Sequence, residues 1–123
     1  LALEGHTSDV INVAFSPDGG MLVSNSWGGT VILWDTVTGE HVRTLESEIN
    51  FRNVAFSPDG DTLATGAWIG PVVLWNTATG EQVRVLEGHT QYRSVTSMAF
   101  SPDGTTLASV SKDGTVILWD VAR

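Results

Sequence analysis

The C-terminal third of the chain contains the residue types of a hydrolytic triad: His89, a serine at Ser109 or Ser111, and Asp113. Such a trio would supply a nucleophile, a general base and a carboxylate that orients the base. The serines lack the Gly-x-Ser-x-Gly surroundings that place a nucleophile on a sharp turn in many hydrolases. Hydrolysis is therefore supported by residue types alone, without a motif that positions them.

The sequence predicts neither a metal site nor a cofactor site. The three histidines, His6, His41 and His89, do not form a metal-binding spacing. The chain has no cysteine, which excludes disulfides and thiolate metal sites. Gly28 and Gly29 do not lie between a strand and a helix, so they do not indicate a phosphate-binding loop.

The elements that would position these residues recur along the whole chain. The pentapeptide Phe-Ser-Pro-Asp-Gly occurs three times, starting at Phe15, Phe56 and Phe100. A Leu-Trp pair follows each copy, with its tryptophan at Trp34, Trp75 and Trp119. Both markers step by 41 and then by 44 positions, which is the length of a supersecondary repeat and not of a domain.

Each repeat has the pattern of short antiparallel strands joined by tight turns. Ser-Pro-Asp-Gly suits a type I turn, and in the first repeat it separates the apolar segments Val10 to Phe15 and Met21 to Ser24. A third segment is apolar without alternation, which predicts a strand buried on both faces: Thr30 to Trp34, Pro71 to Trp75 and Thr115 to Trp119. Polar and apolar residues alternate in His41 to Leu45 and in Gln82 to Leu86, which predicts an exposed outer strand.

Glycine-histidine and tryptophan-aspartate pairs frame two of the repeats: Gly5-His6 with Trp34-Asp35, and Gly88-His89 with Trp119-Asp120. The middle repeat ends in the variant Trp75-Asn76. These residues and their period resemble the WD-repeat (WD40) propeller family over essentially all 123 residues. The resemblance implies an all-β fold of three four-stranded antiparallel blades, at about residues 5–46, 47–87 and 88–123, arranged around a channel. It also implies a non-catalytic scaffold that binds other proteins.

The resemblance gives the triad residues a structural role. In the family, a loop histidine, a second-strand serine or threonine, a turn aspartate and the tryptophan form a chain of hydrogen bonds; the candidates here are His89, Ser109 or Ser111, Asp113 and Trp119. Breaking such a chain costs roughly 1–3 kcal/mol. The first repeat retains His6 and Trp34 but has Gly28 in place of the aspartate. The second repeat retains Trp75 and has Ile69 at that place.

Two further tryptophans, Trp27 and Trp68, stand at the position that Lys112 occupies in the third repeat. In the family this position resembles a ligand-facing place on the top rim, where large aromatic side chains contribute strongly to binding. The alternative is that each indole fills the space above its own turn, and the sequence leaves both open. Variable loops at the same end supply the other candidate binding residues, which are Asn12, Arg52, Ile69, Tyr92 and Arg93.

Charge and composition restrict the class of partner. The net charge of −8 disfavours a nucleic acid, and no stretch approaches the roughly 18 apolar residues of a membrane span. No signal peptide opens the sequence, and we expect a cytoplasmic protein. Four glutamates near the rim indicate an acidic surface for a peptide that carries Lys or Arg and an apolar anchor, and the alternative is a solvated rim without a ligand: Glu4, Glu46, Glu48 and Glu87.

Three blades are too few to close a ring, because propellers have typically about 4–8 blades. The third repeat has no outer strand of its own, whereas residues 1–4 align with the outer strands of the other repeats: Leu1, Ala2, Leu3 and Glu4. We expect these residues to complete the third blade of a neighbouring chain, closing a homodimer of six blades or a homotrimer of nine. The alternatives are a piece of a longer propeller, a structural or engineered assembly module without a natural ligand, and a small-ligand or hydrolytic propeller.

Overall fold

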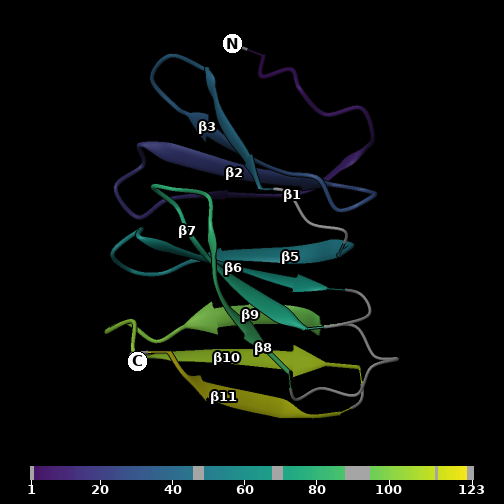
Figure 1. Ribbon diagram of the computed structural model, residues 1–123, viewed down its shortest axis with the longest axis vertical. Helices are drawn as coiled ribbons and strands as arrows, with labels where there is room; N and C mark the ends of the chain where they lie inside the picture. Colours follow the sequence, from purple (N-terminus) through teal and green to yellow (C-terminus); the bar gives the residue numbers. More distant parts are fainter. Residues whose placement is uncertain (1, 46–48, 68–70, 88–94, 113, 122–123) are drawn as a thin grey trace.

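The computed structural model describes residues 2–45, 49–67, 71–87, 95–112 and 114–121. These residues form eleven strands in three antiparallel sheets, which follow one another along the long axis of the molecule (Figure 1). The described part of the chain has no helix that is long and apolar enough to cross a membrane. The predicted all-β architecture is confirmed.

Each sheet corresponds to one sequence repeat, and strands that are neighbours in sequence are hydrogen-bonded neighbours in the sheet. The first sheet consists of β1 (Val10–Phe15), β2 (Met21–Ser26), β3 (Val31–Asp35) and β4 (His41–Leu45). The second sheet consists of β5 (Phe51–Phe56), β6 (Thr62–Ala67), β7 (Val72–Asn76) and β8 (Gln82–Leu86). The third sheet consists of β9 (Val95–Phe100), β10 (Thr106–Ser111) and β11 (Val116–Asp120). The first strands of the three sheets contact one another, β1 with β5 and β5 with β9.

The Ser-Pro-Asp-Gly turns join the first strand of each sheet to the second. In the first sheet the Gly19 N–H donates to the Ser16 carbonyl at 2.9 Å, which closes the turn. The carboxylate of Asp18 accepts hydrogen bonds from the Gly20 N–H and the Ser16 hydroxyl, each at 2.8 Å. These two bonds lower the pKa of Asp18 below its ordinary value. The carboxylate is therefore ionised and available as an acceptor at neutral pH.

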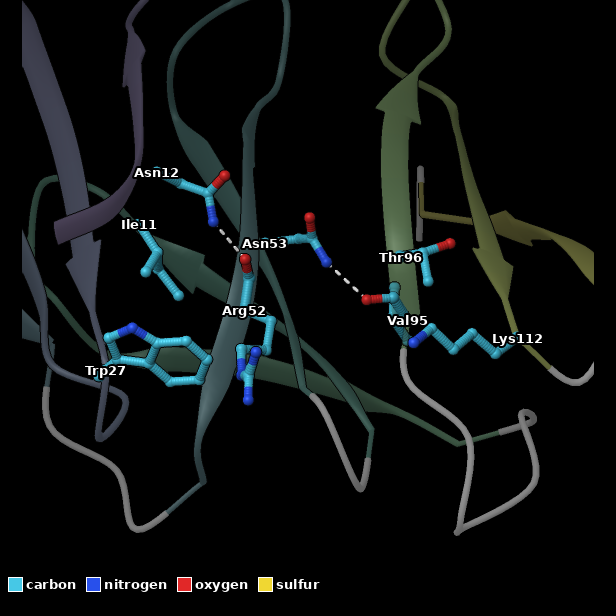
Figure 2. Close-up of a pocket in the computed structure, with 8 residues that line it drawn as sticks. All are labelled: Ile11, Asn12, Trp27, Arg52, Asn53, Val95, Thr96 and Lys112. Carbon is cyan, nitrogen blue, oxygen red and sulfur yellow. Dashed lines mark hydrogen bonds between the residues drawn. The ribbon is translucent and has the colours of Figure 1, made fainter. Parts of the chain in front are cut away.

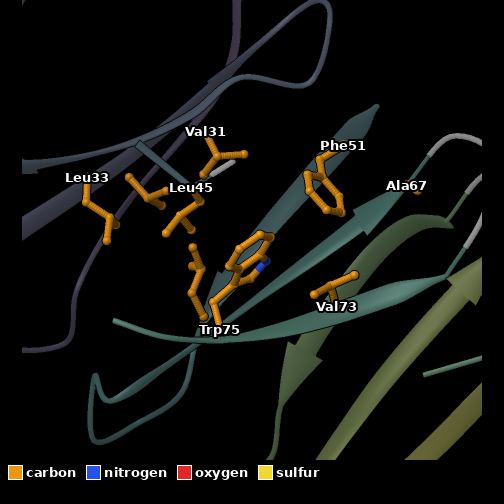
Figure 3. Packing of buried hydrophobic residues seen from close by; sticks show 9 residues of the cluster. Val31, Leu33, Leu45, Phe51, Ala67, Val73 and Trp75 are labelled. Atoms are coloured by element: carbon orange, nitrogen blue, oxygen red, sulfur yellow. The ribbon is translucent and has the colours of Figure 1, made fainter. Parts of the chain in front are cut away.

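Apolar side chains fill the space between successive sheets. Leu33 and Leu45 of the first sheet pack against Phe51 and Trp75 of the second (Figure 3). The rings of Phe51 and Trp75 meet edge to face, with centroids 6.0 Å apart and planes at 81°. A second cluster joins the second and third sheets, and its fully or nearly fully buried members are Ala64, Val72, Leu74, Leu86, Val95 and Leu107.

The third strands of the three sheets are not buried equally. Leu33 of β3 is 0% exposed and Leu74 of β7 is 2% exposed, as the unbroken apolar runs predict. The equivalent Leu118 of β11 is 71% exposed, and Val116 on the same face is 65% exposed. The prediction that β11 is buried on both faces is therefore wrong for the single chain. No sheet in the described part of the chain lies against that face.

Candidate functional site

A cavity of about 450 Å³ opens near the starts of the first strands, and side chains from all three sheets line it (Figure 2). We call it the inner pocket, and its residues are Ile11, Asn12, Trp27, Arg52, Asn53, Val95, Thr96 and Lys112. The structure thereby brings together four of the binding residues that the sequence predicts: Asn12, Trp27, Arg52 and Lys112. The other four lie outside the described residues: Trp68, Ile69, Tyr92 and Arg93.

Three residues of the inner pocket, Ile11, Arg52 and Thr96, occupy equivalent positions in the three repeats. Each lies where the first strand slips by one residue in its pairing with the second strand, as between Val10 and Asn12 in β1. A β-bulge of this kind leaves its extra residue without a cross-strand partner and re-aims the side chain. The three bulges therefore direct one side chain from each sheet toward the inner pocket.

Trp27 lies in the turn after β2, and its backbone N–H donates to the Asp9 carbonyl at 3.0 Å. Its indole is 45% exposed. The guanidinium carbon of Arg52 lies 3.9 Å from the centroid of the Trp27 ring, which is a cation–π contact. The indole thus reaches across to the next sheet and forms part of the pocket wall. Trp27 therefore contacts the neighbouring sheet and does not lie only over its own turn.

Two asparagines join the sheets beside the inner pocket. The side-chain amide of Asn12 donates to the backbone carbonyl of Arg52, and that of Asn53 donates to the carbonyl of Val95 at 2.5 Å (Figure 2). The first bond connects β1 with β5, and the second connects β5 with β9. Asn12, which the sequence predicts as a binding residue, therefore positions the pocket strands with its amide group.

Two of the described residues that line the inner pocket carry a positive charge. These residues are Arg52 and Lys112, which come from the second and third sheets. None of its described lining residues carries a carboxylate. Two of the four glutamates behind the prediction, Glu46 and Glu48, lie outside the described residues. The expectation of an acidic surface that binds a Lys- or Arg-bearing peptide stays a prediction.

A hydrogen bond ties the third-strand tryptophan to the second strand in every sheet. The indole N–H donates at 2.8 Å in each pair: Trp34 to Ser24, Trp75 to Thr65, and Trp119 to Ser109. Ser109, and not Ser111, thus accepts from Trp119. In the first sheet the Nε2 atom of His6 lies 2.6 Å from the Ser24 hydroxyl oxygen and extends the chain. The corresponding His89 and the turn residue Asp113 lie outside the described residues.

The repeats match a known family. The model of the WD40 family, described as WD domain, G-beta repeat, matches residues 1–35, 39–68 and 80–120. The chain belongs to the WD40 repeat family. Each of its sheets is therefore a propeller blade, and the inner pocket lies where three consecutive blades converge.

Known relatives match the chain over short stretches. Protein Mut11 of Chlamydomonas reinhardtii is 56% identical over 43 residues, which are 35% of this chain and 12% of that protein. Small ribosomal subunit protein RACK1z of Arabidopsis thaliana is 44% identical over 45 residues, which are 37% of this chain and 14% of that protein. The solved structure of U3-55K has a TM-score of 0.90 at 24% identity, covering 98% of this chain and 38% of that chain, and so shares the fold. The chain spans well under half the length of each of these proteins.

The WD40 hydrogen-bond chain is incomplete in the first blade. Gly28 stands where the family has an aspartate, and the Nδ1 atom of His6 is buried with no hydrogen-bond partner among the described residues. Burial lowers the pKa of His6 below its ordinary value, and the charge of His41 lowers it further. His6 is therefore neutral at pH 7. Gly28 has no side chain that could pair with this nitrogen.

The His6 and Ser24 pair has the separation of a general base and a nucleophile, but its surroundings differ from those of a catalytic site. Ser24 is 4% exposed, and its oxygen already accepts the indole proton of Trp34. A substrate would have to open the blade to reach this oxygen. In the described part of the chain, no three His, Cys, Asp or Glu side chains are placed to hold a metal ion. The pair therefore fits a structural role.

Sequence reasoning missed Ile11 of the inner pocket and the interblade residue Asn25, whereas Asn53, Val95 and Thr96 lie in the variable segments 51–53 and 91–97 that the sequence indicates. Ile11 stands 41 positions before Arg52, so extending the repeat alignment to this strand would have identified it. Asn25 donates from its side-chain amide to the Phe51 carbonyl at 3.2 Å and joins the first two blades. Its partner is 26 positions away on another sheet, and nothing in the local sequence indicates such a contact.

Proposed function

We propose that the protein is a non-catalytic interaction scaffold that binds a peptide segment of a partner protein in the inner pocket. The observation that carries this proposal is the placement of Trp27, whose indole is half exposed at a cavity that three blades form together. Pockets with an aromatic wall and a few directed polar groups are the usual binding sites of rigid folds. WD40 membership supports the scaffold role.

Selection from a displayed random-peptide library tests the proposal. We expect wild-type protein to enrich peptides that bind Trp27→Ala about 30-fold more weakly, since an aromatic anchor contributes about 2 kcal/mol. The thermal unfolding of the variant should be nearly unchanged, because the indole is half exposed. Val37→Ala is the control, as it removes an 85% exposed apolar side chain outside the pocket. Peptides that bind both variants equally would contradict the proposed site.

The two end blades present open apolar faces, which favours a second property, self-assembly. On the first blade Val13 and Phe15 are 62% and 67% exposed, whereas the equivalent Val54 and Phe56 pack against the core between the first two blades. On the third blade the exposed face is formed by Val116 and Leu118. Apolar patches of this kind mark contact surfaces. These two exposed faces correspond to the two blade faces that pack against each other between the first and second blades and between the second and third blades.

We infer that copies of the chain cover these faces head to tail and close a ring of six or nine blades, with residues 1–4 adding an outer strand beside β11 of the neighbour. Heterologous contacts of this type form rings when the rotation closes. Light scattering after size exclusion should give two or three times the chain mass of 13.1 kDa. Leu118→Asp should reduce this to the mass of one chain. A single-chain mass for the wild type would rule out self-closure.

A further inference from the structure

A second cavity, of about 400 Å³, lies between the second and third blades, at the ends of the strands opposite to the inner pocket. We call it the outer groove. Four apolar side chains line it, Leu74 and Val83 from the second blade and Phe100 and Val121 from the third. Leu74 is buried, Phe100 and Val121 are partly buried against the cluster between these blades, and Val83 is 57% exposed. The groove therefore has an apolar floor and an exposed apolar wall.

The pairing of β7 with β8 explains why Val83 lies in this wall. Leu74 pairs with Arg84, and Trp75 pairs with Gln82, so Val83 is an extra residue without a cross-strand partner. A β-bulge of this kind re-aims the side chain of its extra residue. The bulge thus directs an apolar side chain of the outer strand toward the groove.

Two ionised carboxylates lie beside this apolar surface. Asp59 and Asp103 belong to the Ser-Pro-Asp-Gly turns of the second and third blades, and both line the groove. The Ser101 hydroxyl, with the N–H and hydroxyl of Thr105, lowers the pKa of Asp103 to about 2. The Ser57 hydroxyl lowers the pKa of Asp59 in the same way. Both aspartates are exposed, so a cationic group of a ligand can reach their carboxylates.

The groove opens on an edge that the turns of all three blades share. Because neighbouring strands are antiparallel, the first and third strands of each sheet end at the same edge. The turns of successive blades lie side by side, since a Cβ on Gly60 would be 3.6 Å from Pro17 and one on Gly104 would be 3.4 Å from Pro58. We call this side of the molecule the turn edge.

Acidic side chains are in excess at the turn edge. Eight carboxylates of the described residues lie there: Asp18, Asp35, Glu40, Asp59, Asp61, Glu81, Asp103 and Asp120. The chain has 6 Lys and Arg, and two of them, Arg52 and Lys112, line the inner pocket at the other ends of the strands. At most four basic side chains are left for the turn edge, including Arg84, which lines the groove and donates to the Asp120 carbonyl at 3.0 Å. The excess of carboxylates therefore holds wherever the other arginines lie.

We infer that the outer groove is a second peptide site, which binds a basic segment of a partner protein through an apolar side chain between Val83 and Phe100 and a neighbouring Lys or Arg on Asp59 or Asp103. Hydrogen bonds between such cations and carboxylates are stronger than those between neutral groups. An acidic surface also attracts a basic segment before contact and repels the phosphate backbone of a nucleic acid. This site lies apart from the inner pocket, so it adds to the proposed function and does not depend on it.

The test is a selection of displayed random peptides on the Trp27→Ala variant, in which the inner pocket has lost its indole. We expect peptides with Lys or Arg next to an apolar residue to be enriched, and their synthetic copies to bind wild type and Trp27→Ala equally. Replacing that Lys or Arg by Gln should weaken binding roughly three- to tenfold. Added salt should weaken it as well, because salt screens exposed charges.

The repeats supply matched controls. Asp103→Asn removes the charge but keeps an oxygen that can accept the hydrogen bonds of the turn, and it should weaken binding roughly three- to tenfold. Asp18→Asn makes the same change in the first turn, outside the groove, and should not weaken it. Val83→Thr removes apolar surface at nearly constant shape and should also weaken binding. Its control is Val42→Thr, because Val42 is the equivalent bulge residue of β4 and lies outside the groove.

The outcomes separate this inference from the proposed function. Enriched peptides that bind Asp103→Asn and Val83→Thr as tightly as the two controls would overturn the outer groove. Enriched peptides without Lys or Arg would overturn the basic ligand, and a selection on Trp27→Ala that enriches nothing would overturn the second site. In each of these cases, peptides that the wild type selects and that Trp27→Ala binds weakly would leave the inner pocket standing.

Discussion

Trp75→Ala is expected to lower the free energy of unfolding by about 3–5 kcal/mol, the range for a large aromatic side chain removed from a core. Trp75 is 2% exposed, lies edge-on to Phe51, and belongs to the cluster that joins the first two blades. Its indole also donates to Thr65 at 2.8 Å, so the variant leaves a buried hydroxyl without that partner. Urea denaturation followed by circular dichroism measures the loss.

The third blade supplies a matched comparison for this prediction. Trp119 makes the same hydrogen bond, to Ser109 at 2.8 Å, but its side chain is only partly buried. Trp119→Ala should therefore cost clearly less than Trp75→Ala, because less apolar surface returns to water. If Trp75→Ala does not fold, Trp75→Phe keeps most of the packing and should still lose about 1–2 kcal/mol. Equal losses at the two positions would show that the hydrogen bond, and not the packing between blades, determines their contribution.

The strands and turns could be predicted from the sequence because their signals are local. Ser16, Pro17, Asp18 and Gly19 contain everything that their turn requires, and the structure has that turn closed by one backbone hydrogen bond. The apolar runs likewise predict β3 and β7 to within one residue. Such features depend on residues a few positions apart, so the local amino-acid sequence is enough to identify them.

Contacts between blades could not be predicted in the same way. The bond from Asn12 to the Arg52 carbonyl spans 40 positions, and it depends on a bulge that only the paired strands define. The same holds for Arg52 and Lys112, which line one pocket only because the second and third blades stack. The exposure of Leu118 depends on whether another blade covers it, which the apolar run in β11 does not reveal.

The turn that carries Trp27 provides the second large effect. Gly28 and Gly29 have φ values of +91° and +88°, which side chains with a Cβ rarely adopt. A Cβ on Gly29 would lie 2.6 Å from the Ile49 carbonyl oxygen and 2.9 Å from the Asn50 Cα, both backbone atoms of the segment that enters the second blade. Gly29→Ala therefore combines backbone strain with a clash that no side-chain rotation relieves.

We expect Gly29→Ala to lower the free energy of unfolding by about 1–2 kcal/mol because of the left-handed backbone, and by about a further 1–3 kcal/mol because of the clash. Gly114 is the matched control, because it is the equivalent glycine of the third blade, has a φ of +87°, and has no described heavy atom within 4 Å of the place that a Cβ would take. Gly114→Ala should lose only the 1–2 kcal/mol or so of backbone strain, as measured by urea denaturation.

The clash should also push the first blade away from the second. Gly29→Ala should therefore weaken peptide binding at Trp27 and Arg52, whereas Gly114→Ala should leave the contact between these two side chains in place. Equal losses of stability in the two variants would mean that the segment at Ile49 yields to the added methyl group, and that the close approach of the two blades does not hold the turn.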